Sequence, residues 1–100
     1  MELANANYFI LLALAEGPKH GLEIQRQVVG DSLGFYIRTS TLYTGLEGLA
    51  RTNLIELATE HERGRRKTYR LTEQGKRRLE YAARVQKRAV ELTQQRLGWR

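Results

Sequence analysis

Residues 39–75 read TSTLYTGLEGLARTNLIELATEHERGRRKTYRLTEQG, and the spacing of their apolar positions changes once along the stretch. Leu42, Leu46 and Leu49 follow one another at helical spacing, which predicts a helix with one buried face. From Leu54 the apolar positions alternate with polar ones, and they alternate again over residues 68–71. The polar segment between these two runs contains one glycine, so the sequence predicts a β-hairpin with a long basic tip.

The helix before this hairpin is expected to be capped by Thr39 or Ser40 and to run to about Thr52. At 100° per residue, the face opposite the three leucines carries polar and small residues. These are Ser40, Thr44, Glu47, Gly48 and Arg51, with Thr41 and Tyr43 on the flanks. A polar face of this kind fits the major groove of DNA, because base edges there present hydrogen-bond donors and acceptors.

Two further helices are expected before residue 39. Residues 3–15 are apolar at nearly every position from Tyr8 onward, and Gly17 and Pro18 then stop the helix. A second helix should cover residues 20–29, with Gly30 as its C-cap. Residues 35–37 are aromatic and β-branched, so they are expected to form one short strand or to anchor a loop.

The last predicted helix begins after Thr72, which can cap it, and runs to about Leu97. Its apolar stripe is too broad for a single coiled-coil seam, so the helix should contact both its own domain and a second chain. Residues of this stripe and of the first helix are expected at a dimer interface. They are Phe9, Leu12, Leu79, Ala83, Val85, Val90, Leu92 and Leu97.

Composition excludes several classes of protein. The chain of 100 residues has the length of one small domain, and its 41% hydrophobic residues are too many for a disordered chain. The longest apolar run, residues 8–15, is far shorter than the roughly 20 residues that span a bilayer. Met1 and Glu2 are not followed by a basic secretory signal, so a cytoplasmic protein is expected.

No catalytic or cofactor site is expected. The sequence contains no cysteine, so thiolate chemistry and disulfides are excluded. His20 and His61 lie far apart with no third ligand suggested, and a metal site is therefore not expected. Neither a nucleophile–histidine–carboxylate arrangement nor a glycine-rich phosphate loop stands out, so the protein is not expected to be an enzyme or to hold a cofactor.

Positive charge gathers in the second half of the chain. Residues 1–50 carry three Lys or Arg against five Asp or Glu, whereas residues 51–100 carry 14 against six. This imbalance favours a polyanionic partner, although a solvated surface would have the same composition. Four cations near the hairpin tip are expected to contact DNA phosphates, unless they form only a solvated tip. They are Arg63, Arg65, Arg66 and Lys67.

The predicted order of helices and hairpin is that of a winged helix-turn-helix, a mainly α fold with a small β-hairpin, extended by a long C-terminal helix. Residues 1–72 would form the DNA-binding domain, with its first helix shared with the dimer interface, and residues 73–100 the dimerisation helix. Over roughly residues 8–80 the sequence resembles the PadR family of bacterial transcriptional regulators. The resemblance is carried by LLAL (11–14), EGP (16–18), HGLEI (20–24), STLY (40–43), Leu46, Leu49, NLI (53–55), RK (66–67) and YRLTEQG (69–75).

The resemblance implies a homodimer that represses a promoter by binding double-stranded DNA and is released by a small hydrophobic or phenolic effector. It favours contact of Tyr43 with the DNA backbone over a merely capping aromatic ring. It also gives Trp99 two candidate roles, stacking on the effector or acting as an apolar plug of the dimer helix. The family usually has Pro where this chain has Thr44, and Arg or Lys where Gly45, Glu47 and Gly48 stand.

A second function also fits the composition. The chain could be a small dimeric module whose basic face docks an acidic protein or RNA without recognising an operator. Glu47 on the polar face keeps this alternative open, because a carboxylate repels phosphates unless it accepts from the N4 group of a cytosine. The sequence indicates neither the operator nor the effector.

Overall fold

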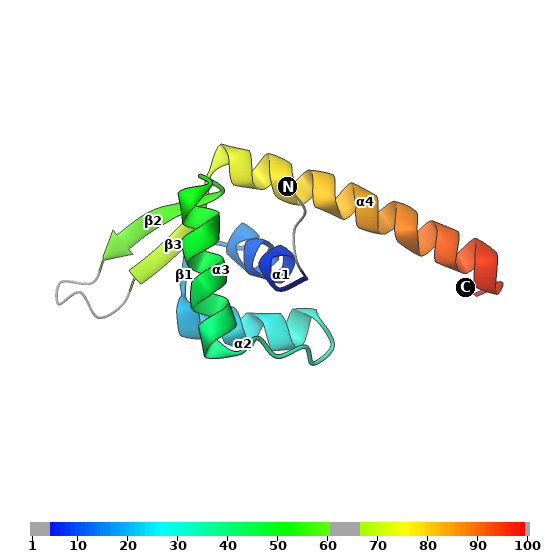
Figure 1. Cartoon of the computed structure of the whole chain (residues 1–100), viewed down its shortest axis with the longest axis horizontal. Helices are drawn as coiled ribbons and strands as arrows, with labels where there is room; N and C mark the ends of the chain where they lie inside the picture. The colour runs from blue at the N-terminus through cyan, green and yellow to red at the C-terminus, as the bar shows by residue number, and fades with distance from the viewer. Residues whose placement is uncertain (1–4, 61–66, 100) are drawn as a thin grey trace.

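The computed structural model describes residues 5–60 and 67–99. Within these residues, four helices and three strands follow one another: α1 (Asn5–Ala15), β1 (Lys19–His20), α2 (Gly21–Asp31), α3 (Thr39–Arg51), β2 (Ile55–Glu60), β3 (Lys67–Leu71) and α4 (Glu73–Leu97). Helices α1 to α3 pack together, the β2–β3 hairpin extends to one side, and α4 projects away on the other (Figure 1). The predicted mainly helical fold with a hairpin and a long last helix is confirmed.

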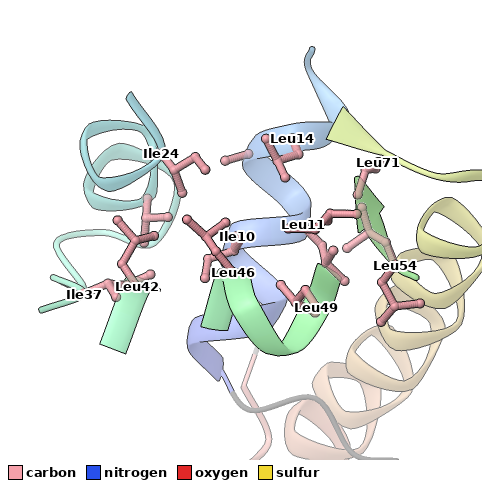
Figure 2. Packing of buried hydrophobic residues seen from close by; sticks show 14 residues of the cluster. Ile10, Leu11, Leu14, Ile24, Ile37, Leu42, Leu46, Leu49, Leu54 and Leu71 are labelled. Carbon is pink, nitrogen blue, oxygen red and sulfur yellow. The ribbon is translucent and has the colours of Figure 1, made fainter. Parts of the chain in front are cut away.

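The core is built from apolar side chains of every helix and of both long strands (Figure 2). Helix α3 reaches close to α1 because Gly45 has no side chain. A Cβ atom at Gly45 would lie 2.7 Å from Oδ1 of Asn7 and 3.0 Å from Cδ1 of Ile10. Gly45 therefore serves the packing of α3 on α1, and it does not belong to the outward face with Glu47 and Gly48.

The hairpin is part of a three-stranded antiparallel sheet with the strand order β1-β3-β2. Strand β1 was not predicted, since two residues are too few to show an alternating pattern. Lys19 pairs with Tyr69, and His20 pairs with Thr68. This pairing joins the start of α2 to β3, so the hairpin is held on the helical core along the central strand of the sheet.

The end of α2 differs from the sequence prediction, because the helix continues through Gly30 to Asp31. It ends at Ser32, whose hydroxyl donates to the carbonyl of Val28 at 2.6 Å and accepts from the N–H of Phe35 at 2.8 Å. The Ser32 side chain thus satisfies two backbone groups, the Val28 carbonyl and the Phe35 N–H, to which a glycine at this position could offer no side-chain partner.

The predicted cap of α3 was wrong, because Arg38 is the N-cap residue and makes no side-chain cap hydrogen bond. Thr39 and Ser40 lie inside the helix. Gln25 of α2 instead donates to the Ile37 carbonyl at 3.1 Å and to Oγ1 of Thr39 at 3.3 Å. Residues 35–37 form no strand, and Ile37 is buried, so this segment anchors the loop before α3.

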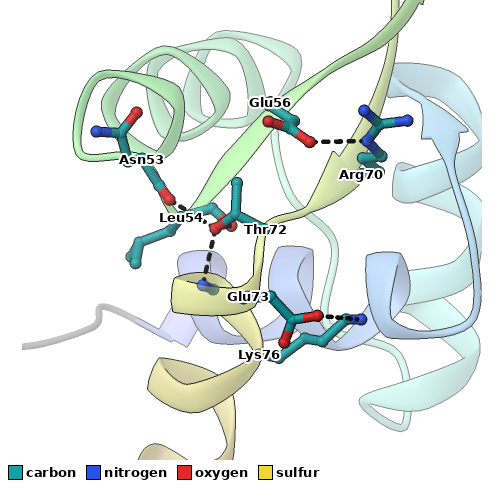
Figure 3. A network of polar contacts seen from close by, with 8 residues as sticks. Asn53, Leu54, Glu56, Arg70, Thr72, Glu73 and Lys76 are labelled. Carbon is teal, nitrogen blue, oxygen red and sulfur yellow. Dashed lines mark hydrogen bonds and ion pairs between the residues drawn. The ribbon is translucent and has the colours of Figure 1, made fainter.

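A compact polar junction connects the turn after α3 to the start of α4 (Figure 3). The Thr72 hydroxyl donates to the carbonyl of Asn53 at 2.6 Å and accepts from the N–H of Gly75 at 2.9 Å, which confirms Thr72 as the cap of α4. The N–H of Thr72 donates to the Leu54 carbonyl at 3.1 Å. Asn53 has a φ of 63°, a left-handed conformation that asparagine tolerates better than most residues. The junction fixes the hairpin base and the direction of α4 together.

Candidate DNA-binding surface

The outward face of α3 is polar and exposed in the structure. Ser40, Thr41, Tyr43, Thr44 and Arg51 are all exposed, whereas the three leucines on the other face are buried. The predicted division of the helix into a buried and an outward face is therefore observed. Contact of these residues with DNA stays a prediction.

Tyr43 has a defined place at the junction of α3 with the start of α2. A Cβ atom at Gly21 would lie 3.0 Å from Oη of Tyr43 and 3.3 Å from its Cζ, so the ring rests on the backbone of Gly21. The side chain nevertheless remains 55% exposed. This arrangement holds an exposed phenol between the two helices of the helix-turn-helix.

The second half of the outward face carries an ion pair between Arg51 and Glu47. Nη2 of Arg51 lies 3.4 Å from Oε1 of Glu47, and both side chains are exposed. Such an exposed pair contributes little to stability, but it balances the positive charge of Arg51 on this face. Gly48 lies one residue further along, and a Cβ atom there would have no heavy atom within 4 Å.

The hairpin is the second part of the predicted surface. Lys67 begins β3 and is exposed, while Arg63, Arg65 and Arg66 lie outside the described residues. At the middle of the hairpin, Nε of Arg70 lies 2.8 Å from Oε2 of Glu56, its directly opposite partner in β2. Arg70 thus acts as a cross-strand ion-pair partner on the central strand of the sheet.

The residues predicted for a dimer interface fall into three groups. Val85, Val90 and Leu97 are exposed on α4, and Leu92 is half-buried. Leu79 is only 9% exposed because it belongs to the core of its own domain. The Phe9 ring contacts the Phe35 ring with centroids 6.0 Å apart, whereas Leu12 and Ala83 line an open groove. The most exposed large apolar side chains of the predicted interface therefore lie on α4, at Val85, Val90 and Leu97.

The groove itself was missed by sequence reasoning, because its walls come from distant parts of the chain. Its volume is about 650 Å³, and it lies between α1, the turn after α1, β3 and the first turns of α4. Apolar side chains form most of its wall, and Arg70, Lys76 and Glu80 bring charges to it. The spacing of apolar residues in the sequence predicts which segments are helices or strands. It does not indicate which of these elements will enclose a groove when the chain folds.

Two other kinds of site were sought in the part of the chain that the structure describes. Residues 5–60 and 67–99 contain no group of three or more His, Cys, Asp or Glu side chains placed to hold a metal ion. Within the same ranges, no helix combines the length and the apolar character needed to cross a membrane.

Comparisons with known proteins agree with this geometry. The structure is similar to a transcriptional regulator from Clostridium thermocellum, with a TM-score of 0.81, 21% identity and coverage of 94% of this chain and 97% of the other. It is also similar to a PadR family transcription regulator from Clostridium difficile R20291, with a TM-score of 0.79, 28% identity and coverage of 94% and 99%. At 18% identity and a TM-score of 0.76, it shares its fold with BpsR of Bordetella bronchiseptica, covering 92% of this chain and 65% of that one.

A comparison with curated protein sequences found no match. The family model described as the transcriptional regulator PadR-like family, in contrast, matches residues 10–81, which include every helix of the helix-turn-helix, the hairpin and the capped start of α4. Members of this family are regulators of transcription and not enzymes. The chain belongs to the PadR-like family of DNA-binding transcriptional regulators.

Proposed function

We propose that this protein is a homodimeric repressor that recognises a promoter sequence and is released by a small hydrophobic effector. The observation that carries the proposal is the exposed polar face of α3, held opposite three buried leucines and next to the β2–β3 hairpin. In functional terms, residues 1–72 bind DNA and residues 73–100 dimerise. The protein would act in the cytoplasm, where its operator is accessible.

Within this proposal, the residues of α3 have two roles. Ser40, Thr44 and Arg51 face outward near the middle of the surface and would contact base edges in the major groove. Thr41 and Tyr43 lie on the flanks and would position the helix on the phosphate backbone. Since Glu47 balances Arg51, the cations of the hairpin would supply most of the attraction for phosphates.

The hairpin role has a direct electrostatic test. Replacing Arg65 and Arg66 together with alanine is expected to weaken binding to all duplexes alike. The plot of log affinity against log salt concentration should flatten by about 1.5–2 units, because each phosphate contact contributes roughly 0.9. Fluorescence anisotropy of labelled duplexes over a salt series measures the slope. An unchanged slope would show that the hairpin tip does not contact DNA.

A matched control is available on the outward side of α4. Arg84 and Arg88 are exposed cations outside the proposed DNA surface, and each pairs with a carboxylate of its own helix. Their double replacement with alanine removes the same charge from the protein and should leave the salt slope nearly unchanged.

The homodimer is supported by the apolar residues of α4 that no part of its own described chain covers. Val85, Val90 and Leu97 are all about half exposed or more, and so many exposed apolar residues on one helix are unusual for a monomer. Light scattering at micromolar concentration is expected to give about twice the mass of one chain. A monomer at that concentration would contradict the proposed homodimer, and with it the proposed recognition of two half-sites related by a two-fold axis.

Release by an effector is supported by two observations. BpsR, which shares the fold, is described as having its DNA binding regulated by 6-hydroxynicotinic acid. In this chain the Trp99 side chain is 55% exposed and offers an aromatic surface on which such a molecule could stack. Thermal-shift screening of small aromatic acids, followed by DNA release, tests this part of the proposal.

The alternative is a basic docking module without an operator, and the ion pair of Glu47 with Arg51 favours it because it weakens the positive charge of α3. Competition with random-sequence duplex separates the two functions. A regulator keeps its selected duplex in a large excess of random duplex, whereas a docking module loses both equally.

A further inference from the structure

Glu47 lies near the centre of the face of α3 that points away from the core. Its direction around the helix differs by about 20° from that of Ser40 and by about 40° from that of Arg51. The Glu47 side chain is 79% exposed, and the three buried leucines lie on the opposite side of the helix. When this face of α3 enters the major groove, the Glu47 carboxylate therefore points at base edges.

The residues beside Glu47 leave room for a close approach. Gly48 has no side chain, and a Cβ atom there would have no heavy atom of the described residues within 4 Å, so packing within the chain does not explain this glycine. A glycine on an exposed face lets the helix backbone come close to another molecule. In the second half of α3, Glu47 and Arg51 are then the two polar side chains that reach outward.

The charges of α3 do not suit a helix that binds only phosphates. The helix contains one carboxylate, Glu47, and one cation, Arg51, so its formal net charge is zero. Contact with phosphates is strengthened by cations alone, because each neutralised phosphate releases counterions. A carboxylate on this face weakens binding to every duplex unless it makes a contact that depends on the sequence. The presence of Glu47 thus favours a role in reading bases.

The two charged groups match the groups that one C·G base pair presents in the major groove. Cytosine presents its N4 amino group as a donor, and the paired guanine presents O6 and N7 as acceptors. N4 and O6 are hydrogen-bonded to each other within the pair, so they are neighbours. Nη2 of Arg51 and Oε1 of Glu47 are neighbours as well, at 3.4 Å. Adenine also presents an amino group, but its N7 acceptor lies beside that group and repels a carboxylate.

We propose that Glu47 and Arg51 together read one C·G base pair in each half-site of the operator. The Glu47 carboxylate accepts from N4 of the cytosine, and the Arg51 guanidinium donates to O6 and N7 of the guanine. The inference rests on the proposed binding of α3 in the major groove, and it adds Glu47 to the residues that determine specificity. Thymine or guanine in place of the cytosine would turn an acceptor toward the carboxylate, so Glu47 also rejects these bases.

Glu47→Ala gives the first test, in competition between the operator selected by the unchanged protein and random duplex. Random duplex should bind more tightly, because a negative charge that faces DNA is removed. The preference for the operator should nevertheless fall by about 5- to 150-fold, the effect of one lost base contact. An unchanged preference would overturn the proposal, since Glu47 would then act on all duplexes alike.

The matched control is Glu80→Ala on α4. Glu80 pairs with Arg84 four residues later, as Glu47 does with Arg51, and the charged atoms are 3.5 Å apart. Both side chains of this pair are mostly exposed. The control removes the same charge from the same kind of ion pair, outside the proposed DNA surface, and should leave the operator preference unchanged. Circular dichroism checks that both variants keep their helices.

A modified base separates direct contact with cytosine from a role of Glu47 that only orients Arg51. In N4-methylcytosine, a methyl group replaces the amino hydrogen that faces the major groove, while the hydrogen used for base pairing remains. At one cytosine of each half-site, this base should weaken binding of the unchanged protein by at least about 5-fold and binding of Glu47→Ala by less than about 2-fold. Insensitivity of the unchanged protein at every cytosine, or equal sensitivity of both proteins, would overturn the contact.

Enrichment of random duplexes separates failure of this inference from failure of the proposed function. Glu47→Ala should select the motif of the unchanged protein, relaxed at one symmetric pair of C·G positions. If both proteins select the same two-fold motif, the assignment of Glu47 is wrong and the proposed regulator stands. If the unchanged protein selects no motif, the proposed function fails and this inference fails with it.

Discussion

Replacing Gly75 with alanine is expected to lower the free energy of unfolding by about 3 kcal/mol, the upper end of the usual range for overpacking. The added Cβ atom would collide with the carbonyl oxygen of Leu54 and would lie 2.9 Å from its carbonyl carbon. Both atoms belong to the backbone, so no side-chain rotation relieves the clash. The same Leu54 carbonyl accepts the N–H of Thr72, and moving it would also disturb the cap of α4.

Gly48 provides the control for this substitution. It is also a helical glycine, but its Cβ position has no heavy atom within 4 Å. Gly48→Ala should therefore raise the free energy of unfolding by about 0.5–1 kcal/mol, since alanine loses less conformational entropy in a helix. Urea unfolding followed by circular dichroism measures both variants. Equal effects of the two substitutions would contradict the close approach of α4 to Leu54.

Replacing Thr44 or Arg51 with alanine is expected to reduce the preference for the selected operator over random duplex by about 5- to 150-fold each. This range corresponds to about 1–3 kcal/mol for a lost base contact. Both residues lie on the exposed face of α3, and neither contributes to the buried core, so the variants should fold normally. Competition binding at one fixed salt concentration measures the ratio of the two affinities.

Tyr43→Phe is the control for this experiment, since it removes one hydroxyl from the flank of the same helix. Without the phenol O–H to donate to a phosphate, binding to operator and to random duplex should weaken together, and the ratio of the two affinities should stay nearly constant. If Tyr43→Phe changed the ratio while Thr44→Ala and Arg51→Ala did not, the roles proposed for the two parts of α3 would be reversed.

Much of the fold could be predicted because its signals are local. Leu42, Leu46 and Leu49 reveal the buried face of α3 through spacing alone, and the same three positions define the outward face. The change to a period of two marks the hairpin, and Thr72 indicates the start of α4 because its side chain can cap a helix. Each of these features depends on residues within a few positions of one another.

The features that were missed depend on contacts between distant segments. Gly45 looked like a departure on the DNA-binding face, yet it lies against Asn7 and Ile10 of α1. Gly75 belongs to the family motif YRLTEQG. A glycine is needed there because the backbone of Leu54 passes close to the start of α4, and this contact exists only in the folded chain. Strand β1 has no pattern of its own and is defined by its partner β3.

Enrichment of random DNA duplexes on the purified protein tests the homodimeric, sequence-specific regulator most directly. Two recognition helices related by a two-fold axis are expected to select a motif of two inverted half-sites, spaced by about one helical turn of DNA or a multiple of it. The Thr44→Ala variant should then select a motif that is relaxed at one symmetric pair of positions. Enrichment that yields no motif, or a motif without two-fold symmetry, would contradict the proposed function.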